Sequence, residues 1–274
     1  MSLVLASAGI HALWTTLLKR ARNLHTASVS ILGVSVLATG AMLPWIQGPA
    51  FPRPAALVWG LGAGIGEGCY FLALGQALRT APLAWSYSWM RAVGMLLVWP
   101  VSILLLGERL HPVPALSVGV VVAGLGVMGL TGSPGKGFRD FFWVGITGIL
   151  IGGYTLCYKA ALGDGANPVA LYALAMLVAL PVQIGIRIHR QGFKAGTLLP
   201  DQWGLVWLAG LLCTASFLLY LGALSLQGAG AMATLRNTSI VFAVLLSRIL
   251  GERPTRRQWL GAALVTVGAM GLAC

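Results

Sequence analysis

The chain has 274 residues, of which 58% are hydrophobic and 9% are charged, and its formal net charge is +12. Soluble domains carry roughly 25% charged residues, so this composition excludes an ordinary soluble protein and predicts one that lies in a lipid bilayer. The basic residues lie in short stretches between apolar runs and do not line one face, which argues against a nucleic-acid-binding surface.

Ten apolar runs are long enough to cross a bilayer, which takes about 20 residues within a range of about 17–25. The connections between them are short, and two of them, 49–54 and 131–137, carry the Pro and Gly residues typical of turns. The basic residues near the first run follow it, so we expect a retained helix and not a cleaved signal peptide. The predicted spans are 2–18, 27–47, 55–78, 82–106, 112–131, 141–162, 168–188, 203–224, 229–250 and 255–273.

The distribution of Lys and Arg predicts the orientation of these spans, because cytoplasmic connections are enriched in both. The even-numbered connections hold only Arg53, Arg109 and Lys159. We therefore expect the odd-numbered connections to be cytoplasmic and both termini to lie outside the cytoplasm. The odd-numbered connections hold Lys19, Arg20, Arg22, Arg79, Lys136, Arg139, Arg187, Arg190, Lys194, Arg248, Arg253, Arg256 and Arg257.

The two halves of the chain repeat each other. Gly107-Glu108-Arg109 matches Gly251-Glu252-Arg253, and upstream of each motif one arginine lies within an apolar run, Arg91 and Arg236. Self-similarity at a fixed period predicts a duplicated architecture, here residues 1–133 and 138–274. Because each unit holds five spans, an odd number, the second must enter the membrane inverted, as in alternating-access transporters. The alternative is a duplicated protein with a scaffolding role only.

These features resemble the EamA-type branch of the drug/metabolite transporter superfamily. The resemblance lies in Leu-Gly-Glu-Arg before a glycine-rich last helix in each half, and in His11-Ala12-Leu13-Trp14 and Gly153-Tyr154 in the first helix of each half. Thr15 stands where a bacterial subgroup usually has Asn. The resemblance covers essentially the whole chain. It implies a ten-helix, multi-pass carrier of the bacterial inner membrane, with a central cavity lined mainly by the first four helices of each half.

Glu67 is the acidic residue that falls within an apolar run, and ionisable groups inside a bilayer are functional candidates because they are costly there. We expect it to be a counter-ion for a substrate amine or a proton carrier. The alternative is a structural partner for Arg91 or His11. His11 is the second candidate for proton coupling, because the histidine charge changes near neutral pH.

Arg91 and Arg236 cannot release protons, so they are candidates for binding a substrate carboxylate or phosphate. The alternative is that each holds a kinked helix through backbone carbonyls. Aromatic side chains on the same helices could surround an ammonium or an apolar ring, although Trp and Tyr also concentrate at membrane interfaces. The remaining predicted substrate-binding residues are Trp14, Tyr70, Trp85, Tyr154 and Asn237.

Together these features predict a secondary transporter, most simply an exporter, of a small amine-containing or zwitterionic metabolite such as an amino acid. A carrier of phosphate- or phosphonate-like anions that uses both arginines remains open, as does a membrane receptor or assembly factor that transports nothing. The sequence shows neither a nucleophile with its base nor metal-ligand spacing among the four cysteines, so we expect no enzyme activity, no metal and no cofactor. The expected partners are a small-molecule substrate, a proton as coupling ion and the lipid bilayer, with no nucleic acid. Since the two halves can form a cavity together, we expect a monomer.

Overall fold

The structure is a computed structural model that describes residues 2–80, 82–107, 112–129, 138–191, 202–251 and 253–271. Every regular element within these ranges is helical, as the sequence predicts. Two short 3₁₀ turns, η1 (Leu43–Trp45) and η3 (Arg248–Leu250), extend α2 and α10. The α-helices are α1 (Ser2–Arg20), α2 (Leu24–Met42), α3 (Pro54–Thr80), α4 (Leu83–Leu106), α5 (Pro112–Gly129), α6 (Phe138–Gly163), α7 (Pro168–Gln191), α8 (Trp203–Leu226), α9 (Ala229–Arg236), α10 (Ser239–Ser247) and α11 (Arg256–Gly271).

Eight segments in the described part of the chain are long and apolar enough to cross a membrane. They correspond to the predicted spans one to four and six to nine, so the assignment to multi-pass membrane proteins is confirmed. The predicted fifth and tenth spans are the helices α5 and α11, of 18 and 16 residues. Both adjoin residues outside the described ranges.

The ninth predicted span differs from a simple helix, because it is broken between α9 and α10. The amides of Asn237 and Thr238 bond to carbonyls three residues earlier, at 3.0 and 3.1 Å, and the Thr238 hydroxyl donates to the Leu235 carbonyl at 2.8 Å. Such bonds tighten a helix into a 3₁₀ turn, and Asn and Thr favour them because their side chains compete for the backbone. The break lies directly after Arg236.

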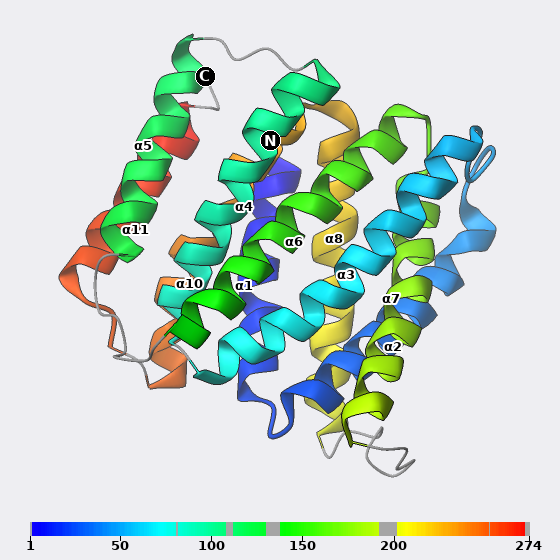
Figure 1. Ribbon diagram of the computed structural model, residues 1–274, viewed down its shortest axis with the longest axis horizontal. Coiled ribbons are helices and arrows are strands. Elements are labelled where there is room, and N and C mark those ends of the chain that lie inside the picture. The colour runs from blue at the N-terminus through cyan, green and yellow to red at the C-terminus, as the bar shows by residue number, and fades with distance from the viewer. Residues whose placement is uncertain are drawn as a thin grey trace.

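The helices form a bundle with one separate pair at its side (Figure 1). Helix α5 packs against α11 at one edge, while α2 and α7 lie at the opposite edge. Between them, α3 contacts α6 and α7, α4 contacts α6, and α1 contacts α8 and α10. Helices from the first and second halves of the chain therefore alternate throughout the bundle.

Glycines allow the close contact between α5 and α11. A Cβ added to Gly124 would lie 2.8 Å from the Gly261 carbonyl oxygen, and one added to Gly268 would lie 2.7 Å from the Ser117 carbonyl oxygen. Real Cβ atoms do not approach so closely, so the two backbones can meet only where the side chain is missing. Small residues at helix interfaces of membrane proteins have this effect in general.

Helix ends follow the local sequence. Asn23 and Asn167 cap the starts of α2 and α7, and their side-chain oxygens accept bonds from backbone amides two and three residues later. Gly107 and Gly251, the first residues of the repeated motif, both have a left-handed backbone, with φ of 66° and 75°. Glu108, Arg109 and Glu252 of that motif lie outside the described residues.

The connections meet in pairs at the ends of the bundle. The second and sixth connections touch through the amide of Asn167 and the carbonyl of Ala50 at 3.0 Å, and through the ion pair of Arg53 and Asp164 at 3.3 Å. At the end of α1, the Arg22 amide donates to the Gln202 side chain just before α8, at 3.2 Å. Two even-numbered connections thus share one end of the bundle, and the first and seventh connections share an end.

Candidate functional site

Glu67 lies in α3 with its side chain fully buried. The Tyr158 hydroxyl donates to its Oε1 at 3.1 Å, while Oε2 has no hydrogen-bond partner among the described residues. The alternative role of Glu67 is that of a structural partner for Arg91 or His11. Among the described residues no ion pair joins Glu67 to either of them, and the salt bridge present there is the exposed one between Arg53 and Asp164. Half of the Glu67 carboxylate is therefore available to another donor.

Glycines on both sides of Glu67 explain its burial. Gly64 and Gly68 lie so close to α7 that an added Cβ would approach Val178 and Val182 to 2.7 and 2.8 Å. Gly66 lies against α6 in the same way, because an added Cβ would be 3.2 Å from the Tyr154 Cβ. Three glycines at alternate positions thus bring two helices of the second half against the segment that carries the carboxylate.

Aromatic rings surround this carboxylate. The Tyr70 ring meets Tyr154 edge to face at 5.4 Å between centroids, and Tyr154 meets Tyr158 at 5.8 Å. Phe71 stacks on Trp14 at 5.7 Å. The Tyr154 hydroxyl is buried and has no hydrogen-bond partner among the described residues. The cluster therefore combines π faces with one unfilled carboxylate oxygen and one unfilled hydroxyl.

His11, Trp14 and Arg236 form one hydrogen-bonded group. Trp14 Nε1 and Arg236 Nη2 each lie 3.1 Å from His11 Nδ1. Because indole and guanidinium nitrogens only donate, His11 Nδ1 must be the acceptor of both bonds and carries no proton in this arrangement. The Arg236 guanidinium also lies over the rings of Tyr220 and Phe217, at 3.9 and 4.5 Å from their centroids.

Arg91, which the sequence pattern matches to Arg236, has different surroundings. Its guanidinium lies 5.7 Å from the centroid of the Tyr87 ring. Its Nε and Nη2 atoms are buried and have no hydrogen-bond partner among the described residues. Asn237, another residue predicted to bind substrate, donates to Met95 Sδ at 3.2 Å.

A small cavity lies between the two arginines. Its volume of about 10 Å³ leaves room for roughly one water molecule. The walls come from α4 and from the second-half helices α6, α8 and α9, so the cavity lies between the halves of the chain. The polar side chains that line it are Arg91, Thr155, Tyr220, Arg236 and Asn237.

The structure brings most of the predicted residues together but leaves Trp85 apart. Trp85 packs on Trp89 and Phe141, at 6.4 and 5.1 Å between ring centroids. None of the ring contacts or hydrogen bonds within the described ranges connects it with Glu67 or the small cavity. The sequence-based set also omits Tyr158, Tyr220 and Phe217, although Tyr158 follows Tyr154 by one helical turn.

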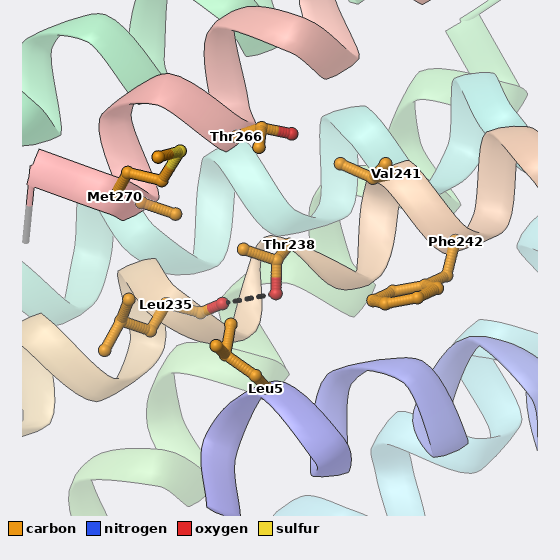
Figure 2. A pocket seen from close by; sticks show the side chains of 8 residues that line it. Leu5, Leu235, Thr238, Val241, Phe242, Thr266 and Met270 are labelled. Atoms are coloured by element: carbon orange, nitrogen blue, oxygen red, sulfur yellow. Dashed lines mark hydrogen bonds between the residues drawn. The ribbon is translucent and has the colours of Figure 1, made fainter. Parts of the chain in front are cut away.

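A second cavity, of about 290 Å³, opens between α1, the α9–α10 break and α11 (Figure 2). Leu5, Leu235, Val241, Phe242 and Met270 supply apolar walls. The hydroxyls of its two threonines, Thr238 and Thr266, already donate to the backbone carbonyls of Leu235 and Ala262. This cavity therefore presents little to orient a polar solute. In the described part of the chain, no group of three or more His, Cys, Asp or Glu residues could hold a metal ion.

Comparison with known proteins agrees with this architecture. Residues 140–274 match the EamA-like transporter family. A curated protein of a Sinorhizobium species, named "Uncharacterized transporter in cobO 3'region", is 39% identical over 72 residues, or 26% of this chain and 51% of that protein. The matched part thus spans about half the length of that relative.

A solved crystal structure has the same fold, with a TM-score of 0.73 over 98% of this chain and 96% of the other. At 18% sequence identity this likeness shows the fold alone. The family match and the transporter-named relative support an EamA-type transporter of the drug/metabolite transporter superfamily.

Proposed function

We propose that the protein is a secondary transporter that exports a small amine-containing or zwitterionic metabolite, such as an amino acid, across the bacterial inner membrane. The observation that carries this proposal is the fully buried Glu67, whose Oε2 has no partner among the described residues. A substrate ammonium would donate to this oxygen and lie against the neighbouring tyrosine rings, as cations do in aromatic cages. We propose export because of the family resemblance and not because of any residue in the site.

Alternating access between two inverted repeats is the mechanism we propose. The helix contacts support it, because the pattern of contacts stays the same when each helix is replaced by its counterpart in the other half. The contact of α1 with α8 corresponds to that of α6 with α3, and the contact of α2 with α8 corresponds to that of α7 with α3. The meeting of the second and sixth connections at one end also agrees with an inverted second half. In such folds the substrate site lies where the repeats meet.

The size of the central cavity fits a closed state in this cycle. With room for about one water molecule, the space between Arg91 and Arg236 is too small for an amino acid. Substrate entry then requires the two halves to move apart, which would open the cavity towards Glu67.

The anion carrier that uses both arginines is the weaker candidate. Arg236 already donates to His11 and lies over two aromatic rings. Binding a phosphate-like group there would break an existing hydrogen bond, whereas an amine at Glu67 fills an unused acceptor.

A thermal-shift screen of purified wild type and Glu67→Gln tests the proposal. The panel contains amino acids, quaternary amines, nucleosides and phosphonates, since a ligand that binds only the folded state raises its stability by mass action. Asp164→Asn is the matched control, because it removes a carboxylate that is paired at the surface. We expect amines or zwitterions to stabilise wild type and the control but not Glu67→Gln, and to be transported into liposomes. Stabilisation by anions alone, equal in all three proteins, would contradict the amine role, and binding without liposome flux would indicate a receptor.

A further inference from the structure

The two duplicated arginines differ in what they already bind. We infer that Arg91 is the binding residue for a planar oxyanion, the carboxylate of the transported solute, and that Arg236 is a positioning residue that binds no substrate. This inference rests on the proposed function, because it assigns the second end of the zwitterion whose amine Glu67 would bind.

The free atoms of Arg91 form one complete edge of its guanidinium. Nε and Nη2 point their N–H bonds to the same side, and this edge makes two parallel hydrogen bonds with a carboxylate. Both atoms are without a partner in the described part of the chain, and the residue is only 4% exposed. Buried polar groups are nearly always hydrogen-bonded, so a whole unfilled edge indicates a ligand that is absent from this state.

The small central cavity gives this edge a place for a ligand. Arg91 and Arg236 both line it, together with Thr155, Tyr220 and Asn237, which bring two hydroxyls and an amide from the second half of the chain. A carboxylate held by Arg91 would therefore contact both halves of the protein. Such a contact is what couples binding to a relative movement of the halves.

The same edge of Arg236 is only half free: its Nε has no partner among the described residues, but its Nη2 is already used. Its Nη2 donates to His11, and its planar face lies over Tyr220 and Phe217. Using the same edge for a carboxylate would cost the bond to His11. Its contacts instead hold α9 against α1 and α8, so removing it should change stability more than ligand choice.

Tyr154 connects the two proposed ends of the site. It lies beside Thr155, which lines the small cavity with Arg91, and one helical turn before Tyr158, which donates to Glu67. A buried carboxylate and a buried guanidinium placed near the same stretch of α6 favour a ligand that carries an ammonium and a carboxylate. The class this describes is the α-amino acid and close analogues.

The first experiment uses wild-type protein and compounds that differ only in their charged ends. Phenylalanine, phenylalaninamide and 3-phenylpropionate form one set, and alanine, alaninamide and propionate form a smaller one. Dissociation constants are measured by calorimetry in detergent. In the set that binds more tightly, we expect the amide to bind at least about tenfold more weakly than the acid. This is a difference in binding free energy of about 1.4 kcal/mol or more. Equal affinity of the acid and the amide would overturn the inference.

The second experiment compares Arg91→Lys with Arg236→Lys. Both keep the positive charge and lose the planar fork. Arg91→Lys should weaken amino acid binding about tenfold and leave the amide unchanged. Arg236→Lys should lower the melting temperature and change acid and amide affinities by the same factor. A selective loss of the acid in Arg236→Lys, or an equal loss of both compounds in Arg91→Lys, would contradict the assignment.

These measurements separate the inference from the proposed function. If 3-phenylpropionate binds through Arg91 and Glu67→Gln has no effect, the carboxylate site stands and the amine role of Glu67 fails. If phenylalaninamide binds through Glu67 as tightly as phenylalanine, the amine role stands and the carboxylate site fails. If none of the six compounds binds wild type, both are wrong.

Discussion

Arg236 and His11 lie 225 residues apart in the sequence, and the Nη2 of one donates to the Nδ1 of the other at 3.1 Å. This bond connects α1 with the end of α9, directly before the break in the ninth span. Trp14 donates to the same nitrogen. One histidine nitrogen thus accepts a hydrogen bond from an arginine and one from a tryptophan, and without it both of these buried N–H groups would lack a partner.

The first prediction concerns His11→Ala. The substitution leaves one N–H of Trp14 and one of Arg236 unpaired, each at a cost of about 1–3 kcal/mol. We expect a fall of several degrees in the melting temperature of the purified protein. His189→Ala is the control, because His189 lies exposed near the end of α7. Equal melting temperatures of the two variants would show that the bond contributes nothing.

A second prediction separates two tyrosines that lie one helical turn apart. The Tyr158 hydroxyl donates to Glu67, whereas the Tyr154 hydroxyl has no partner in the described ranges. Tyr158→Phe should therefore lower the free energy of unfolding by about 1 kcal/mol or more, while Tyr154→Phe should not. Conversely, Tyr154→Phe should weaken binding of an amine or amino acid ligand. Chemical denaturation and calorimetry measure the two effects, and the opposite order of stabilities would contradict this prediction.

How much of this site the sequence could predict depends on how far apart in the sequence the interacting residues lie. Burial of Glu67 follows from the glycines beside it, which are adjacent in sequence and share its helix. The partner of His11 could not be predicted, because Arg236 reaches it only through packing of α1 against helices of the second half. The sequence does not predict the break after Arg236 either, because the run 229–250 is mainly apolar and its Asn and Thr resemble ordinary polar positions within a helix. The neighbours of Trp85 could not be predicted either, because its position on the same helix as Arg91 does not say which element that part of the helix meets.

The third prediction concerns orientation in the membrane. Arg22 lies in the first connection, and Gln47 follows η1 in the connection between α2 and α3; both are exposed. If the odd-numbered connections are cytoplasmic, a membrane-impermeant maleimide should label Gln47→Cys in intact cells and Arg22→Cys only after lysis. Cys69 and Cys157 are partly accessible and should be replaced in the background. Labelling of both positions from one side would contradict the span assignment, and the reverse pattern would invert the orientation.

The last prediction tests the glycine contact between α5 and α11. A Cβ at position 124 would lie 2.8 Å from the Gly261 carbonyl oxygen and 2.9 Å from the Leu264 Cβ, whereas one at position 126 would meet nothing within 4 Å. Gly124→Ala should therefore force the helices apart, at a cost of about 1–3 kcal/mol. Gly126→Ala, the matched control two residues along the same helix, should be neutral or stabilise the protein by up to about 1 kcal/mol, because alanine favours a helix more than glycine. Melting temperatures of the two variants in the same detergent measure the difference. Since α5 and α11 pack mainly on each other, Gly124→Ala should lower stability without changing the affinity for a ligand at Glu67. A loss of affinity equal to that of Glu67→Gln would show instead that this helix pair shapes the central site.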